Sequence, residues 1–126
     1  QTFGVRAIPT FKFGEANVIV SFGADFLGTW ISPVEYAREY AKNRKIRGAK
    51  GAKMSRHYQV ESHMSLTGSN ADNRILIKPS ETGAAIVALY NALTGNSGGP
   101  KLSNDKSAAA INKMAQDLLA NKANHS

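Results

Sequence analysis

The stretch VIVSFGADFLGTW, residues 18–30, decides the fold. It opens with five almost uniformly apolar residues, Val18 to Phe22, a run typical of a strand buried on both faces of a parallel sheet. The chain then leaves the strand through Gly23, and the carboxylate of Asp25 follows at the tip of the turn. Glycine turns after strands hold phosphates in many α/β proteins, but a carboxylate repels an anion. The shape of the turn and the charge of its tip therefore predict opposite properties.

A helix follows this turn. Ser32, Pro33 and Glu35 form a capping box with proline at the first helical position, which predicts a helix from Pro33 to about Arg44. We expect its apolar side to consist of Val34, Ala37, Tyr40 and Ala41. Residues 45–53, rich in glycine and cations, are predicted to form an exposed loop.

Two further strands and two further helices are predicted downstream. Arg56–Glu61 and Arg74–Lys78 read as strands, separated by a polar segment that is mostly loop with room for one helical turn. Ser80 is expected to cap a helix over Glu81–Leu93, which stops at Gly95. Residues 95–106 resemble a linker, and Ser107 is expected to cap a C-terminal helix over 107–122.

The helix at 81–93 is apolar almost all round, so we expect it to be buried on more than one side. In an isolated chain, a second copy could cover these apolar faces and give a crystal dimer. The chain begins at Gln1 rather than methionine, and we expect it to be part of a longer protein.

Helices between apolar strands imply crossover connections and a parallel sheet. We therefore predict one α/β domain over residues 1–126, a Rossmann-like three-layer fold with a mainly parallel sheet of about three or four strands. The loops after the carboxyl ends of the strands form the ligand edge of such a sheet. Here those loops are residues 23–30, 61–73 and 79–82.

Composition restricts the chemistry. The 126 residues contain no cysteine, which excludes disulfides, thiolate metal sites and cysteine-bound iron–sulfur clusters in this segment. No apolar run is long enough to span a bilayer. The histidines have no recognised metal spacing, and neither a metal site nor a catalytic constellation is predicted.

The net charge of +7 is one local feature. Residues 38–56 hold eight cations and one acid, which gives +7, and the remaining eight cations and eight acids cancel. This run is a solvated helix end and loop, or a docking surface for an acidic subunit, a redox carrier or anionic lipid. Because it lacks interleaved aromatics and a nucleic-acid motif, we do not expect nucleic-acid binding.

The segments ANVIVSFGADF and YQVESHMSLTGSNADNRILIKPSETGAAIVALYNAL resemble the molybdopterin oxidoreductase superfamily. In that superfamily, turns after three strands grip the guanine nucleotide end of the cofactor. The segments SFGADFLGTWISPVEYAREYAKNRK and MSRHYQVESHMSLTGSNADNR are most similar to the large iron–sulfur subunit of alternative complex III, a quinol-oxidising bacterial respiratory complex. There the molybdopterin-like part is a relict domain without a molybdenum cofactor.

The resemblance implies a non-catalytic structural domain of a membrane-associated complex on the periplasmic side, with other subunits as partners and iron–sulfur clusters elsewhere in the parent protein. It also implies a vestigial cofactor site at Gly23, Asp25, Glu61, Lys78 and Thr82. The alternative is a functional molybdopterin guanine dinucleotide-binding domain, which the retained Gly23, Pro79 and Thr82 favour.

The departures from the family pattern favour the relict. Asp25 replaces an asparagine that could donate to a phosphate, and Lys78 replaces an arginine fork by a point charge. With Glu61 and Glu81, three acids would face an anionic ligand. A plainer interpretation of Asp25 is that it caps a short helical turn or pairs with a neighbouring cation.

Overall fold

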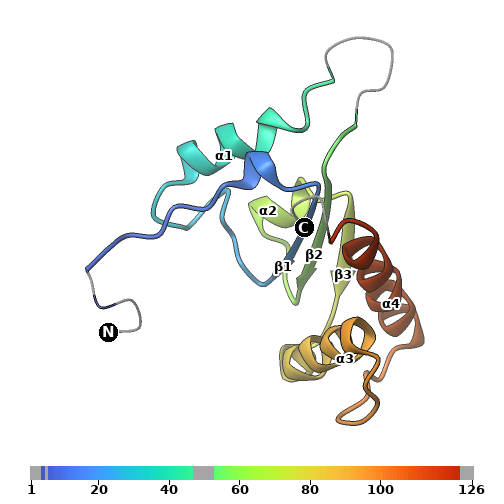
Figure 1. The fold of residues 1–126 in the computed structure, drawn as a ribbon. Coiled ribbons are helices and arrows are strands. Elements are labelled where there is room, and N and C mark those ends of the chain that lie inside the picture. The colour runs from blue at the N-terminus through green and yellow to red at the C-terminus, as the bar shows by residue number, and fades with distance from the viewer. Residues whose placement is uncertain (1–3, 5, 47–52, 123–126) are drawn as a thin grey trace.

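The computed structural model describes residue 4 and residues 6–46 and 53–122 (Figure 1). It contains a parallel sheet with helices on both faces, so the α/β, Rossmann-like three-layer prediction is confirmed. In chain order the elements are η1 (Phe13–Glu15), β1 (Val18–Phe22), α1 (Pro33–Lys42), β2 (Arg56–Glu61), α2 (Leu66–Ser69), β3 (Asn73–Leu76), η2 (Pro79–Glu81), α3 (Thr82–Thr94) and α4 (Asp105–Ala120).

The sheet has the order β1-β2-β3, and both pairs of strands are parallel. Val18 lies opposite Arg56 and Phe22 opposite Val60, while Glu61 pairs with Leu76. This register brings the carboxyl ends of all three strands to one edge, as the sequence predicts. Strands β1 and β2 have the predicted bounds, because apolar residues and glycine punctuation mark their ends clearly.

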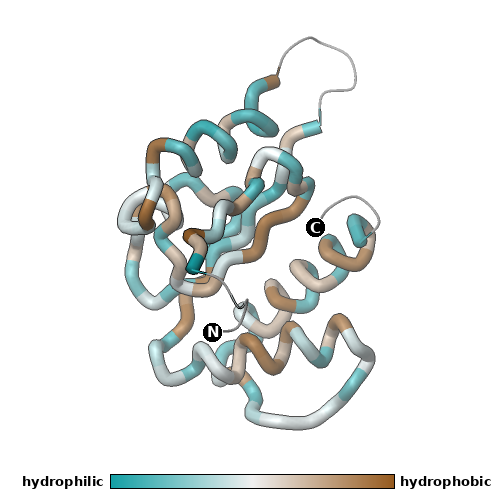
Figure 2. The backbone as a smooth tube through the Cα atoms, turned by 60° about the vertical axis from the view of Figure 1, so that its left-hand side comes forward, coloured by the Kyte–Doolittle hydropathy of each residue, from teal (hydrophilic) through white to brown (hydrophobic). Residues whose placement is uncertain are grey.

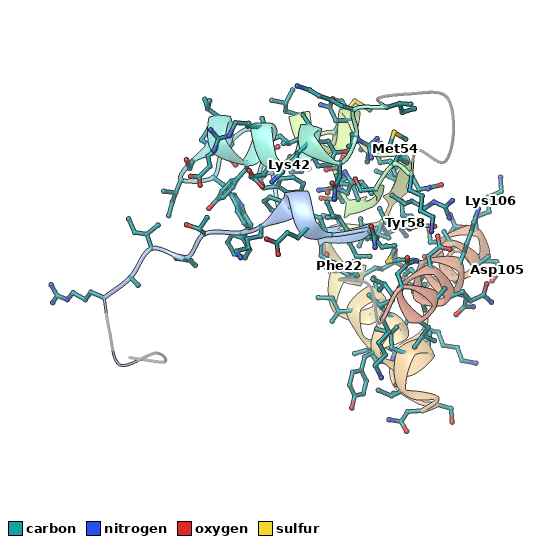
Figure 3. The ribbon with its side chains drawn as sticks, turned by 45° about the horizontal axis from the view of Figure 1, so that its top comes forward. Phe22, Lys42, Met54, Tyr58, Asp105 and Lys106 are labelled. Carbon is teal, nitrogen blue, oxygen red and sulfur yellow. The ribbon has the colours of Figure 1, made fainter. Side chains whose placement is uncertain are left out.

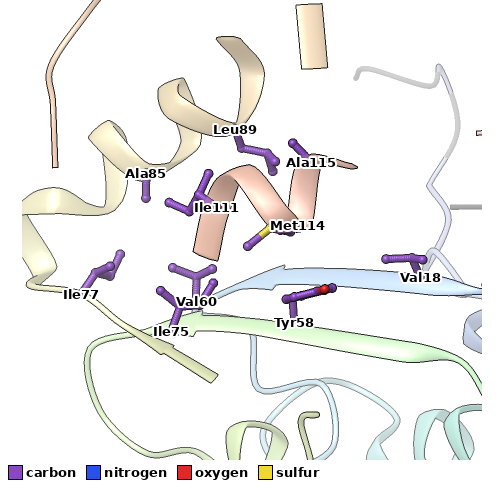
Figure 4. Packing of buried hydrophobic residues seen from close by; sticks show 10 residues of the cluster. All are labelled: Val18, Tyr58, Val60, Ile75, Ile77, Ala85, Leu89, Ile111, Met114 and Ala115. Carbon is purple, nitrogen blue, oxygen red and sulfur yellow. The ribbon is translucent and has the colours of Figure 1, made fainter. Parts of the chain in front are cut away.

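Neighbouring residues of the sheet face different cores because side chains alternate along a strand. Val18, Tyr58 and Val60 pack with α3 and α4, as Figure 4 shows. Ile111, Met114 and Ala115 supply the α4 side of this core, at the predicted helical spacing. On the opposite face, Ile19 packs with the aromatic side chains of Phe26, Tyr36 and Tyr40 beneath α1.

Helix α1 differs from its prediction in cap and in orientation. The Ser32 hydroxyl donates to the Glu35 carboxylate at 3.1 Å and makes no bond to the backbone, so the expected capping box is not formed. Tyr40 is buried as expected, and Tyr36 is buried beside it, whereas Val34 is 83% exposed and Ala37 is also exposed, so the prediction is wrong for these two. The two tyrosines dominate because they offer far more apolar area to bury than Val34 or the alanines. The predicted loop at 45–53 lies mostly in residues 47–52, outside the described ranges.

The later boundaries also shift. Strand β3 ends at Leu76 rather than Lys78, although Ile77 still enters the core. Ser80 lies inside the short helix η2 and does not cap α3, which ends at Gly95 with a φ of 73° as expected.

Asn104, not Ser107, caps α4 by accepting from the Lys106 N–H at 2.9 Å. The C-terminal helix therefore starts at Asp105, two residues earlier than predicted.

Helix α3 is buried on one side only, which corrects the expectation from its apolar sequence. Ala84, Ala85 and Leu89 are buried, but Ile86 and Tyr90 are exposed. A three-stranded sheet with α4 beside α3 cannot cover a whole helix (Figure 1). None of the helices in the described ranges combines the length and hydropathy needed to cross a bilayer.

Candidate functional site: the carboxyl edge of the sheet

The predicted ligand edge is filled by the chain itself. After β1, Gly23 has a φ of 62°, which suits glycine, and its N–H donates to the Val60 carbonyl at 2.8 Å. This bond extends the ladder by one residue before the chain turns away. The short helix α2, which follows β2, then sits against the turn after β1 and receives the side chains of Asp25 and Glu61.

Asp25 is a cap rather than a free charge. Its Oδ1 accepts from the Thr67 N–H at 3.0 Å and from the Thr67 hydroxyl at 2.7 Å. The same hydroxyl accepts from the Leu27 N–H at 3.0 Å, and Thr67 is fully buried. A Cβ on Gly28 would lie 2.4 Å from the other carboxylate oxygen, so the second glycine of the turn makes room for Asp25. The plainer interpretation of Asp25, a cap for a short helical turn, is therefore the arrangement that the structure has.

Glu61 is also saturated by protein donors. It is 3% exposed, and Arg74 donates to Oε1 at 2.5 Å while the Ser65 hydroxyl donates to Oε2 at 2.7 Å. Burial raises the pKa of Glu61, but the bonds from Arg74, Ser65 and Gln59 outweigh it and lower the pKa below its usual value. Ser65 in turn caps α2 by accepting from the Gly68 N–H at 2.9 Å. Glu61 is thus ionised and occupied at neutral pH.

The face of β2 toward α1 and α2 carries a row of buried polar side chains, His57, Gln59 and Glu61. Gln59 donates to the Ala24 carbonyl at 3.2 Å and to Glu61 at 3.3 Å. The Nδ1 atom of His57 lies 3.0 Å from the Tyr40 hydroxyl, and its Nε2 atom lies 3.2 Å from Gln59 Oε1. Burial lowers the pKa of His57 and raises that of Tyr40. We call His57, Gln59 and Glu61, together with Asp25 and Thr67, the polar layer.

An ion pair closes the other end of the polar layer. Arg44 binds Asp72 through both carboxylate oxygens at 2.7 Å and donates to the Ser55 carbonyl at 2.7 Å. Asp72 also accepts from the His57 N–H at 2.8 Å. The Arg44 guanidinium therefore lowers the pKa of Asp72. This pair ties the end of α1 to the turn before β3.

The third predicted loop is occupied by local contacts. Glu81 Oε2 accepts weakly from the Lys78 N–H at 3.4 Å, and Glu81 Oε1 accepts from the Ser103 N–H at 2.9 Å. The Thr82 hydroxyl donates to the Pro79 carbonyl at 3.0 Å. Of the predicted site residues, Asp25 and Glu61 thus meet around α2, whereas Lys78 and Thr82 serve the start of α3. In the described ranges, no three histidine, aspartate or glutamate residues gather as a metal site would require.

Sequence reasoning missed the donors of this edge. Thr67, Gln59 and Arg74 carry no motif, because a buried threonine or glutamine is recognised only once its partner strand is known. One signal was available: β2 alternates Tyr58 and Val60 with His57, Gln59 and Glu61, and such a row of polar side chains on a central strand requires partners when both faces are covered.

Comparison of the chain with models of known protein families and with curated proteins gave no match.

Proposed function

We propose that this chain is a non-catalytic structural domain, derived from a molybdopterin oxidoreductase, of a membrane-associated, quinol-oxidising respiratory electron-transfer complex. The resemblance of the segments around Gly23, Glu61 and Lys78 supplies the family and the complex. The observation that carries the non-catalytic role is the occupied carboxyl edge, where Asp25 and Glu61 are bonded to α2 and Arg74.

A nucleotide at this edge would need donors for its phosphates. The Thr67 N–H and hydroxyl, which could serve as donors, are taken by Asp25, and the Nε–H of Arg74 is taken by Glu61. Freeing them would leave a carboxylate without partners in a partly buried position, which costs about 1–3 kcal/mol or more for each group. The edge therefore resists an anionic ligand by charge and by occupation.

In this proposal the parent protein carries iron–sulfur clusters in another part of its chain and lies on the periplasmic side of the bacterial inner membrane. The other subunits of the complex are its partners, and molybdopterin is not a resident cofactor of this segment. The domain would hold neighbouring subunits in place while electrons pass elsewhere.

Titration of the 15N-labelled chain with guanosine diphosphate tests the role. We expect no shift of the Gly23, Asp25 and Thr67 amides up to about 1 mM nucleotide, the range of non-specific contact. Saturable binding in the micromolar range at these amides would overturn the structural role. Metal analysis of the full-length parent should give iron without stoichiometric molybdenum.

The second candidate is a functional molybdopterin guanine dinucleotide-binding domain. The conformation of Gly23 favours it, because its φ is 62° and, apart from its chain neighbours, no atom lies within 4 Å of the position a Cβ would take. Backbone of this kind can approach a ligand closely. The same titration separates the two, since this function requires the nucleotide to displace the bonds between Asp25 and Thr67.

A further inference from the structure

The outer surface around α1 carries two hollows of different chemistry. The first, which we call the anchor hollow, measures about 340 Å³ and is lined by Pro9, Phe11, Thr29, Trp30, Ile31 and Tyr36. The second measures about 430 Å³ and is lined by Arg38, Glu39, Lys42 and Lys45. Both lie on the side of the sheet opposite α3 and α4.

The anchor hollow is built from a cluster of aromatic side chains. The rings of Phe11 and Trp30 are 5.1 Å apart, and Phe11 and Tyr36 are 6.0 Å apart. The Tyr36 hydroxyl also donates to the Pro9 carbonyl at 3.4 Å, which holds the N-terminal segment over the ring. Ile31, at the rim, is 75% exposed. Aromatic side chains that surround an open hollow are typical of the energetic centre of a protein interface.

Helix α1 also carries cations of the second hollow on its outward face. Tyr36 and Tyr40 point inward, so helical periodicity places Val34, Arg38 and Lys42 in one outward row. All three are exposed, and Figure 3 shows Lys42 on α1, away from Lys106 on α4. Figure 2 shows α1 as a mainly hydrophilic helix with a hydrophobic beginning. Lys42 has Glu39 at 3.9 Å as a surface partner, and Arg44 lies outside this row because Asp72 holds it.

We propose that this face of α1 docks an acidic segment of a partner protein, with one apolar side chain seated in the anchor hollow and carboxylates lying along Arg38, Lys42 and Lys45. Charge complementarity selects the acids: three cations and one acid line the second hollow, within the run of residues 38–56 that holds the whole net charge. The anchor hollow favours a protein over a lipid surface as the partner, because a bilayer has no single side chain to insert.

The geometry sets the spacing of the partner's residues. Tyr36 lines the anchor hollow and Lys42 lines the second, and they are six positions apart on α1, which is about 9 Å along the axis. An extended chain covers about 3.3 Å per residue, so the acids should lie about three positions from the anchor. This inference rests on the proposed structural role, because it names the surface through which such a domain would hold a neighbouring subunit.

Selection from a display library of random peptides, about 12 residues long to cover both hollows, tests the proposal on the chain as it stands. We expect enrichment of peptides with a large apolar residue and two or more acids at the stated spacing. Trp30 is the only tryptophan of the chain and lies in the anchor hollow, so its emission should change when a synthesised winning peptide that lacks tryptophan binds.

The charge-reversed chain with Arg38→Glu and Lys42→Glu should bind the winning peptide at least about tenfold more weakly, a difference of about 1.4 kcal/mol. The matched control, Lys101→Glu with Lys106→Glu, makes the same change in net charge at exposed positions elsewhere and should keep the affinity. Amide spectra of both variants show that they fold.

Three results would overturn the proposal. They are enrichment of no peptide, enrichment without acids or without an apolar anchor, and equal loss of binding in both charge variants. Vesicles of phosphatidylcholine with phosphatidylglycerol, and random duplex DNA, serve as alternative occupants. Binding of either at physiological salt more tightly than the winning peptide would assign the face to lipid or nucleic acid instead. Nucleotide binding at Gly23 would refute the structural role without touching this result, so the two failures are distinguishable.

Discussion

Gly68 offers a sharp test of the occupied edge. A Cβ added there would lie 1.9 Å from Glu61 Oε1 and 2.6 Å from the carboxyl carbon, so Gly68→Ala forces the Glu61 carboxylate out of its place. Its bonds from Arg74 and Ser65 are then lost or lengthened. A hydrogen bond to a charged group contributes about 1.5–3 kcal/mol, and overpacking adds about 1–3 kcal/mol. We expect a loss of about 3–5 kcal/mol in the free energy of unfolding.

The matched control is the same substitution in α3. Gly83 has no atom within 4 Å of its Cβ position, so Gly83→Ala should stabilise the chain by about 0.5–1 kcal/mol through lower entropy of the unfolded state. Urea unfolding followed by circular dichroism measures both. With a slope of about 2 kcal/mol per molar urea, Gly68→Ala should lower the midpoint by about 2 M.

A double-mutant cycle locates the cause. In a chain with Glu61→Ala the obstructing carboxylate is gone, so adding Gly68→Ala should cost about 1 kcal/mol or less. A loss below about 1 kcal/mol for Gly68→Ala in the natural background would refute the reasoning, since overpacking alone reaches that figure. So would an undiminished cost in the Glu61→Ala background.

The remaining predictions concern the polar layer and its neighbours. Thr67→Val keeps the shape but removes the hydroxyl between Asp25 and Leu27, and calorimetry should show a loss of about 2–4 kcal/mol, with Thr67→Ser losing less than half of that. Asp25→Asn keeps an oxygen for Thr67, so it should cost only about 1–2 kcal/mol and should not create nucleotide binding in a titration. Because burial lowers the pKa of His57, the unfolded chain takes up its proton first, and the urea midpoint should fall as pH drops below the ordinary histidine value of 6.5. A second, steeper fall is expected near pH 3.8 and below, where Asp72, whose pKa Arg44 lowers, loses its charge; His57→Gln should remove the first fall and leave the second. Tyr58→Phe removes the bond to Asp117 that ties β2 to α4 and should cost about 1–2 kcal/mol in the same urea assay, and an unchanged midpoint would contradict this role.

The sheet was predictable because its signals are local. Val18–Phe22 is an apolar run that ends at glycine, and Arg56–Glu61 is bounded by loop residues, so both strands have the expected ends. The parallel arrangement followed from helices between strands. The caps were less predictable: Ser80 and Ser107 have the right chemistry for a cap, but Pro79–Glu81 forms a short 3₁₀ turn and Asn104 takes the α4 position.

The site was predictable in position but not in its contacts. The register brings the loops after β1 and β2 together, as the strand pattern indicated. What the pattern could not contain is that Thr67 would face Asp25, because the two are 42 residues apart and neither belongs to a motif that names the other. The inward side of α1 was predicted only in part for a related reason: helical spacing placed Tyr40 there but did not choose between Val34 and Tyr36.

Helix α2 has a consequence for what this edge can bind. It contains four residues, yet Asp25 in the turn after β1 and Glu61 at the end of β2 both hold it. The carboxyl edge of the sheet thus carries an occupant that belongs to the same chain, and a free nucleotide would have to displace it against its high effective concentration. Replacing Asp25 with asparagine would not empty it, because the amide oxygen would keep the tether. Ligand binding at this edge would require the occupant to be removed as well, which no single substitution at Asp25 achieves.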